Sequence, residues 1–333
     1  MPRAYRTGRV ILSWWLVALL LPIAAPAGAG EIKGDWLGRM AEAMRNLAYE
    51  GTLVYGYGSE METLSVVHGV LDGREHERIR ALTGEPFEVI RDGDTIRALW
   101  PSREHTLIAQ QPARLLPSGL PEGLASLPGL YEAEVEDTSR IAGRIARVIR
   151  VTSTDEFRYG YRLWIDRESH MLLRSDLIAP DGEIVERLMF TRFSILESVG
   201  PEDFEPTHAE REYIEYGEPI PDLHALDDPE WQVTELPPGF HTVTHRSQSL
   251  PQGGNAVQQS VYSDGLASVS VFVQSLDEAP GDLFEGAAAL GAVNAFVTRT
   301  DDREITVVGE VPPITVRRIA RAVEQAEEQA TAE

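Results

Sequence analysis

The side chains best suited to bind a metal ion are the eight histidines of the chain. His241 and His245 are four residues apart, a spacing that places them on one face of a helix or a strand. His68 and His76 flank a predicted tight turn and would meet across a hairpin. A zinc site needs further ligands at motif spacing, and the sequence has neither an HExxH motif nor a cysteine. We therefore expect structural or surface histidines, and no metal or other cofactor.

Catalytic motifs are equally hard to find. Gly56-Tyr57-Gly58 begins like a dinucleotide fingerprint, but no third glycine and no helix follow it. There is no GxSxG elbow and no Walker loop. The 53 acidic residues create carboxylate pairs by chance, so none can be singled out as a general acid and base. The sequence favours a binding protein over an enzyme. The competing hypothesis of an envelope hydrolase would require a polar catalytic group inside a cavity.

The N-terminus predicts export. Arg3, Arg6 and Arg9 form a basic segment, an apolar run of about 12 residues follows over 10–21, and Ala27-Gly28-Ala29 supplies a cleavage site. A run of this length is too short to span a bilayer, which takes about 20 residues. We expect residues 1–29 to be a signal peptide and the mature protein to be exported and soluble.

Composition narrows the class of partner. Without cysteine the chain has no disulfide, and it lacks the residue that carries the lipid in lipoproteins. The formal net charge is −23, and loss of the three signal-peptide arginines takes it to −26. Such a charge opposes binding to nucleic acid. A length of 333 residues with 43% apolar side chains predicts two domains.

The elements that must position any site begin with a helix. Asp35 is a suitable N-cap, and Trp36, Met40 and Met44 recur at helical spacing. From Tyr49 onward the pattern becomes that of short strands, joined in places by Asp-Gly pairs that favour tight hairpin turns. The pattern predicts an antiparallel meander. The expected strands are 49–57, 62–71, 74–82, 86–92, 94–100, 103–109, 131–137, 140–153, 156–166, 170–180 and 183–197.

Two stretches of this region are candidates for ligand binding. Residues 110–130 are rich in proline and leucine, which predicts either a lid over a cavity or short helices packed on the sheet. Over 157–165, apolar and polar residues alternate. This places Arg158 and Arg162 on a solvent face. The opposite face would carry Phe157, Tyr159, Tyr161, Leu163 and Ile165, as packed core or as a cavity wall.

Beyond Ser198 the composition changes. Residues 198–230 hold eleven acidic residues and five prolines, which favours an extended linker, although an interaction strap would have the same composition. From Trp231 a smaller α+β domain is expected, with strands at 240–247, 257–263, 266–274, 294–300 and 303–309. Asp264-Gly265 supplies a hairpin turn, and Pro312-Pro313 starts a helix that runs to about Glu328.

Several motifs resemble those of the RseB/MucB family over nearly the whole mature length. In the second domain they are 236–240 (LPPGF), 263–273 (SDGLASVSVFV) and 309–320 (GEVPPITVRRIA). Weaker matches in the first domain are 48–52 (AYEGT) and 161–166 (YRLWID). Each motif alone is modest, but their order along the chain is specific.

The resemblance implies a mainly β, α+β protein: a LolA-like antiparallel half-barrel with covering helices over 30–197, the linker 198–230, and a smaller α+β domain over 231–333. It implies that the second domain binds the periplasmic segment of an RseA/MucA-type anti-sigma factor and protects it from regulated proteolysis, thereby restraining an envelope-stress sigma factor. It also implies that the first domain senses a lipidic ligand such as lipopolysaccharide or a mislocalised lipoprotein.

Candidate residues follow from this resemblance. Those for the lipid cavity are Phe157, Tyr159, Tyr161, Leu163, Leu116, Leu120 and Leu124. Those for the partner are Asp264, Leu266, Phe272, Val311 and the basic residues Arg317, Arg318 and Arg321 of the last helix. Turn chemistry alone explains Asp264, and solvation alone explains the arginines. A homo-oligomer is compatible with the sequence. The alternative function is a periplasmic lipid or lipoprotein carrier, which would have no need of the second domain.

Overall fold

The computed structural model describes residues 36–93, 95–100, 105–110, 129–207, 214–215, 224–225, 229, 231–248, 257–276, 285–300 and 303–331. The expected signal peptide and most of the proline- and leucine-rich insert, with Leu116, Leu120 and Leu124, lie outside these residues. None of the helices among these residues has the length and hydropathy needed to cross a membrane.

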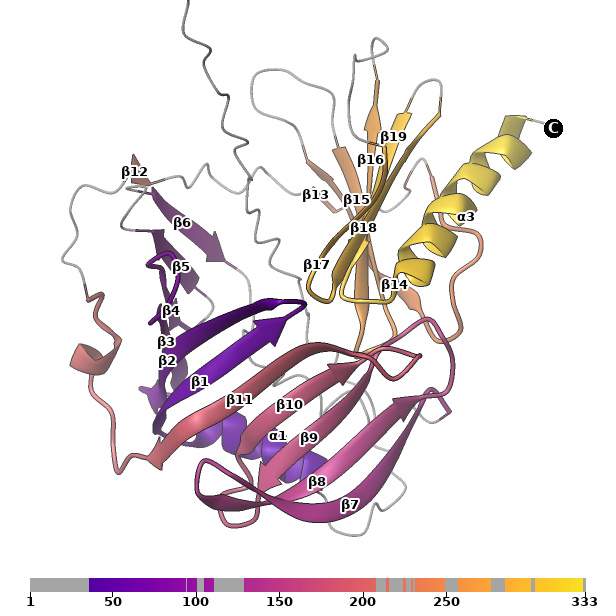
Figure 1. The fold of residues 1–333 in the computed structure, drawn as a ribbon. Coiled ribbons are helices and arrows are strands. Elements are labelled where there is room, and N and C mark those ends of the chain that lie inside the picture. The colour runs from indigo at the N-terminus through magenta and orange to yellow at the C-terminus, as the bar shows by residue number, and fades with distance from the viewer. Residues whose placement is uncertain are drawn as a thin grey trace, which may run out of the picture.

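A 12-stranded sheet forms the first unit of the molecule (Figure 1). Its spatial order is β12-β6-β5-β4-β3-β2-β1-β11-β10-β9-β8-β7, and all pairs are antiparallel except β12 with β6. The expected meander is confirmed, with β1 pairing β11 so that the two halves of the chain form one sheet. The strands are β1 Tyr49–Tyr57, β2 Glu60–Leu71, β3 Arg74–Ala81, β4 Glu88–Asp92, β5 Thr95–Trp100, β6 His105–Gln110, β7 Tyr131–Ile141, β8 Arg144–Ser153, β9 Gly160–Asp166, β10 Leu172–Ile178, β11 Ile184–Ile195 and β12 Ile214–Glu215.

Tight turns set the register of this sheet. Asp72 and Gly73 have φ values of 51° and 75°, and Ala142 and Gly143 have 48° and 79°. Two successive residues with positive φ match the right-handed twist of the flanking strands in a two-residue hairpin. The second turn corrects one expectation: β7 continues to Ile141, so the predicted break near residue 138 is wrong. The first position of this turn is Ala142, and the sequence does not reveal the turn because alanine rarely adopts a positive φ.

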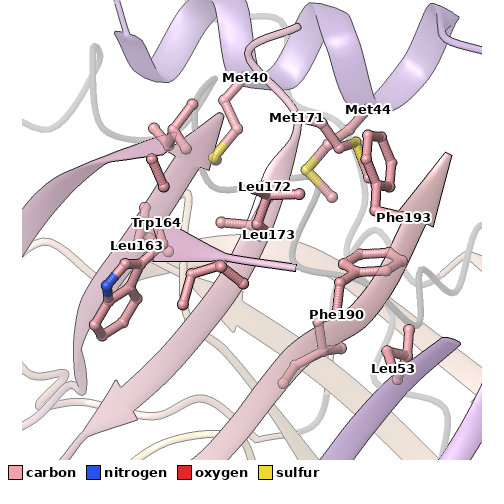
Figure 2. Packing of buried hydrophobic residues seen from close by; sticks show 14 of the residues in the cluster. Met40, Met44, Leu53, Leu163, Trp164, Met171, Leu172, Leu173, Phe190 and Phe193 are labelled. Atoms are coloured by element: carbon pink, nitrogen blue, oxygen red, sulfur yellow. The ribbon is translucent and has the colours of Figure 1, made fainter. Parts of the chain in front are cut away.

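Helix α1 (Trp36–Asn46) covers one face of the sheet, which we call the α1 face. Leu37, Met40, Ala41 and Met44 recur every three or four residues and are buried. Figure 2 shows Met40 and Met44 directed at Met171, Leu172 and the two phenylalanines of β11. The helix therefore completes the core of the first unit.

The second unit is a seven-stranded sheet with one helix (Figure 1). Its order is β13-β14-β15-β16-β19-β18-β17, all antiparallel. Valines of β16 and β19 pack against Val316, Ile319 and Val323 of α3 (Pro313–Thr331), which starts at a proline as expected. The strands are β13 His224–Ala225, β14 His241–Gln248, β15 Val257–Ser263, β16 Ser268–Ser275, β17 Gly286–Leu290, β18 Val293–Arg299 and β19 Arg303–Gly309. Strand β17 is absent from the sequence prediction.

The segment between the units adds to both sheets where it is described. A short 3-10 helix, η1 (Pro201–Phe204), buries Phe204 against His76, with ring centroids 5.4 Å apart. Thr207 donates its backbone amide to Glu88 at 3.0 Å. Further along, β12 pairs with β6 and β13 pairs with β14. Where it is described, the acidic segment thus contacts both units. It makes more contacts than an extended linker predicted from composition would make.

Candidate functional site

The described contacts between the two units centre on a buried arginine. Arg158 lies in the loop before β9, with its side chain fully buried. Its Nε lies 3.2 Å from Oδ2 of Asp264, and its Nη1 lies 3.5 Å from Asp155. It also donates to the carbonyl of Pro238. The prediction that Arg158 faces solvent is therefore wrong, because β9 begins only at Gly160 and the preceding loop turns toward the second unit.

Aromatic rings enclose this arginine from both units. The guanidinium carbon is 5.7 Å from the ring centre of Tyr131 and 5.3 Å from that of Phe240. Rings at these distances stabilise a cation while they exclude water. Burial and the neighbouring Asp264 carboxylate raise the pKa of the Tyr131 phenol, so the tyrosine stays neutral and can donate to Asp264, 3.3 Å away.

Asp264 has two roles. Its Oδ1 accepts the backbone amides of Leu266 and Ala267 at 2.8 and 2.7 Å, and Gly265 has φ 96°. The predicted turn at Asp264-Gly265 is confirmed in position, but it spans four residues and β16 starts at Ser268 instead of 266. Oδ2 of Asp264 faces Arg158 and Tyr131 of the first unit. The turn motif explained the residue locally, but it carried no signal of this second contact.

A second set of contacts surrounds the β17–β18 turn. Asn294 donates its side-chain amide to the Tyr159 hydroxyl at 3.0 Å and to the carbonyl of Val311 at 2.9 Å. The backbone amide of the fully buried Ala292 donates to Glu186 at 2.6 Å. The Glu186 carboxylate of the first unit thus accepts a hydrogen bond from a backbone amide of the second unit. We call these two sets of contacts, together with those of Phe157 below, the junction.

The junction brings two carboxylates together. Burial raises the pKa of Glu186 on β11, although its hydrogen bonds from Ala292 and Tyr55 oppose this. Burial and the nearby charge of Glu186 raise the pKa of Glu310, at the end of β19, to about 7. Like charges in a poorly solvated place disfavour ionisation. The charge of Glu310 is therefore coupled to that of Glu186 in the first unit.

The lipid-cavity candidates fall into separate groups. Leu163 lies on the α1 face, fully buried in the core, and Tyr161 packs beside it with partial exposure. Tyr159 and Phe157 belong to the junction instead. The carbonyl of Phe157 accepts the Thr315 hydroxyl at 2.7 Å, and the guanidinium of Arg318 lies 5.0 Å from its ring centre.

The partner-binding candidates also divide. Asp264, Leu266 and Val311 are buried by contacts within the chain. Phe272 is half-buried, and its position on β16 alternates with the valines that face α3, so it lies on the opposite face of the small sheet. Arg317 and Arg321 of α3 are exposed, whereas Arg318 is partly covered and pairs with Glu235.

His68 is used in structural contacts. His68 stacks on Tyr49 with ring centroids 4.9 Å apart, and its ring contacts Glu75 at 3.3 Å. Burial lowers its pKa, but the Glu75 hydrogen bond and the charge of Glu77 outweigh this, so the net shift is upward. No group of three histidine or acidic side chains able to hold a metal ion occurs in the part of the chain that the structure describes.

Comparison with known proteins covers both units. Residues 33–208 match the family model of the MucB/RseB N-terminal domain, and residues 225–324 match that of the MucB/RseB C-terminal domain. The "Sigma factor AlgU regulatory protein MucB" of Pseudomonas aeruginosa is 33% identical over 319 residues, covering 90% of this chain and 93% of that protein. The "Sigma-E factor regulatory protein RseB" of Escherichia coli K12 is 30% identical over 320 residues, covering 93% and 97%.

Solved structures agree with these matches. A crystal structure of MucB in complex with MucA(peri) aligns with a TM-score of 0.66 and 29% identity, covering 86% of this chain and 96% of that chain. A complex structure of Pseudomonas aeruginosa MucA/MucB gives 0.66 with 30% identity, over the same shares of the two chains. Both domain models and both complexes thus match along nearly the whole described chain.

Proposed function

This chain belongs to the MucB/RseB family, and from that premise we propose that it is a periplasmic regulator that binds the periplasmic segment of an RseA/MucA-type anti-sigma factor. By covering that segment it protects the anti-sigma factor from regulated proteolysis and restrains the envelope-stress sigma factor. The observation that carries the proposal is the match to both family domains in order, together with the structural similarity to MucB in its complexes with MucA.

The division of labour that we propose follows the two units. Residues 30–197 sense a ligand, 198–230 connect, and 231–333 contribute to holding the partner, after a signal peptide over 1–29 directs export. Each unit has its own hydrophobic core, with Leu266 of the second unit packed against the core of the first, and this supports the division. So does the absence of a recognised catalytic motif from the sequence, which favours binding over catalysis.

The ligand that we propose for the first unit is a lipid or an acylated molecule. Between α1 and the junction, the α1 face carries Tyr55, Leu64 and Tyr161, which are only partly buried among the described residues. On β9, Tyr161 lies two residues before Leu163 of the core and directly after the segment with the junction residues Arg158 and Tyr159. A ligand that moves Tyr161 would therefore disturb the loop that contacts the second unit, which supports a link between sensing and release of the partner.

A binding experiment tests the regulator proposal. The mature chain, residues 30–333, is titrated with the soluble periplasmic region of its cognate anti-sigma factor, by isothermal calorimetry. We expect a saturable one-to-one interaction that slows proteolytic cleavage of the fragment. Absence of binding under conditions where both proteins are folded would refute the proposal.

A separate experiment tests the ligand. The mature protein is extracted under native conditions and analysed for acyl chains by mass spectrometry, and then loaded with lipopolysaccharide in detergent below its micellar concentration. Loading should weaken binding of the anti-sigma fragment. A Tyr161→Asp variant, which places a charge on the α1 face, should lose the lipid while its circular dichroism spectrum is retained. Repeated failure to find or load any lipid in the wild type would count against this part.

A further inference from the structure

The edges of the two sheets are treated differently. An edge strand exposes unpaired backbone groups, and proteins usually protect such edges with charges, bulges or a covering strand. In the large sheet, β12 pairs with part of β6, and β7 carries Glu132, Glu134 and Asp137 and has a bulge between Val135 and Thr138. In the small sheet, β13 pairs with part of β14. Three of the four edges therefore have recognisable protection.

The fourth edge, β17, has none of these devices. Its sequence is Gly-Ala-Ala-Ala-Leu, without charge or proline, and its register with β18 runs from Gly286 to Leu290 without a bulge. Residues 287–290 are exposed. No strand other than β18 pairs with it within the described ranges. The edge is therefore regular, uncharged and lined by small side chains that let another backbone approach.

The turn fixes which backbone groups point outward. Leu290 and Val293 close a two-residue hairpin with Gly291 first, at φ 58°, so they form a hydrogen-bonded pair. Hydrogen-bonded and non-hydrogen-bonded pairs alternate along an antiparallel ladder. The amides and carbonyls of Ala287 and Ala289 are consequently directed away from β18. These are the groups that a further strand would use.

The surroundings of this edge are apolar and acidic. Leu290 is 51% exposed, and Met61 on the β1–β2 hairpin, whose tip lies beside β17 in Figure 1, is 72% exposed. A side-chain carbon placed on Gly291 would lie 3.5 Å from Tyr57 at that tip. Glu60, Glu62 and Glu186 are close enough to raise the pKa of the Tyr57 phenol, after the larger effect of its burial. Glu285 adds an exposed carboxylate at the start of β17.

We propose that β17 receives an extended segment of the partner protein as an additional strand, with small or apolar side chains in the segment and lysine or arginine beside it. Main-chain hydrogen bonds to Ala287 and Ala289 supply affinity, as in other cases of strand addition. The carboxylates near the two ends of this edge select a basic segment. The inference rests on the proposed function, because it identifies where the anti-sigma factor's periplasmic region is held.

The test removes one outward donor and leaves the ladder to β18 intact. Proline at position 289 eliminates the amide that faces outward, and proline is tolerated on an edge strand when its nitrogen faces solvent. Ala289→Val is the matched control, because it keeps the amide and suits a strand. Binding of the soluble periplasmic fragment to each mature variant is measured by calorimetry. We expect Ala289→Pro to weaken binding about tenfold or more and Ala289→Val to retain it.

Hydrogen exchange of the wild type provides a readout without substitution. The amides of Ala287 and Ala289 should become protected when the fragment binds, whereas those of Ala288 and Leu290, already bonded to β18, should change less. Equal affinity of Ala289→Pro and wild type, with no new protection at 287 and 289, would overturn the inference while leaving the proposed function intact. No binding by wild type would instead refute the proposed function itself.

Two further measurements separate the parts of the inference. Neutralising Glu60, Glu62 and Glu285 to glutamine together should weaken binding several-fold at low salt and reduce its salt dependence; an unchanged salt dependence would overturn the basic character of the segment. Sedimentation velocity tests the other occupant, a second copy of this chain. If Ala289→Pro abolishes a dimer but leaves fragment affinity unchanged, the edge is an interface between copies and the inference is wrong.

Discussion

The side chain of Arg158 is a positive charge buried in the contact between the two units. Its burial beside Asp264, Asp155 and two aromatic rings satisfies the charge by pairing. Buried ion pairs contribute little net stability compared with apolar contacts, since both charges lose their hydration. Their effect is greatest on geometry, because a charge left without its partner is strongly unfavourable. The pair therefore selects one relative orientation of the units over others.

Glu310 gives the junction a pH dependence. Its pKa is raised to about 7, so the folded protein holds a proton that the unfolded chain has released above pH 5. The contribution of protonated Glu310 to the free energy of unfolding is fully present below about pH 4.5 and is lost as the pH rises through 7. We expect Glu310→Gln, which mimics the protonated form, to be more stable than wild type at pH 8 by about 1–2 kcal/mol and similar to it at pH 5.

Urea unfolding at the two pH values checks this prediction. Glu134→Gln on the exposed side of β7 is the control, and it should parallel the wild type. His68, whose pKa is also raised, loses its contribution in the same direction. The effect of Glu310 is therefore read from the difference in unfolding free energy between Glu310→Gln and wild type at each pH. If this difference is the same at pH 5 and pH 8, the prediction is contradicted.

At this scale the sequence predicts what is local. The turn role of Asp264 follows from the residues beside it, whereas its partner Arg158 lies more than 100 residues earlier in the chain. The alternation of apolar and polar residues placed Arg158 on a solvent face only if β9 already included residue 158, whereas β9 begins at Gly160. The proximity of Glu186 and Glu310 likewise depends on how the two sheets meet, which no local pattern encodes.

Among the elements, hairpin turns are the best predicted. Asp-Gly pairs at 72–73 and 264–265 lie at turns as expected: both residues of the first pair have positive φ, and in the second Gly265 has positive φ while the Asp264 side chain accepts backbone amides. Strand β17 was missed because alanine has a low strand preference, and its pairing with β18 imposes the conformation. Strand boundaries at 137–140 failed because a bulge and an Ala-Gly turn interrupt the expected pattern.

The β15–β16 turn yields a prediction about an element. Gly265 has φ 96°, a conformation that a β-branched residue adopts only with strain. Gly265→Val should destabilise the second unit by about 1–3 kcal/mol. Thermal unfolding followed by near-ultraviolet circular dichroism measures the effect. Gly56→Ala is the control, because Gly56 has no positive φ and its added carbon would meet only the carbonyl of Glu60 at 3.7 Å; equal melting temperatures for the two variants would show that the turn is not strained.

For the molecule as a whole, the junction determines whether the two units behave as one body. Arg158→Met leaves Asp264 buried without its cation, and we expect a loss of about 3–5 kcal/mol in the stability of the junction. Because each unit has its own core, urea unfolding should change from one transition toward two, and small-angle scattering should show a larger radius of gyration. Arg162→Met, which removes an arginine on the outer face paired with Glu136, is the control and should do neither.

A charge-matched second variant distinguishes pairing from packing. Arg158→Met combined with Asp264→Asn removes both charges, so it should recover part of the loss. If the double variant is as unstable as the sum of the two single ones, the ion pair does not couple the units, and the aromatic contacts account for the orientation.

The strands β12 and β13 limit how far the junction can open. β12 remains at the edge of the large sheet and β13 at the edge of the small one, and residues 216–223 join them. Even fully extended, that connection reaches about 30 Å. A separated pair of units would therefore still meet at an effective concentration on the order of millimolar. Any molecule that displaces one unit from the other must compete with this local concentration, and reclosure after its departure needs no search through solution.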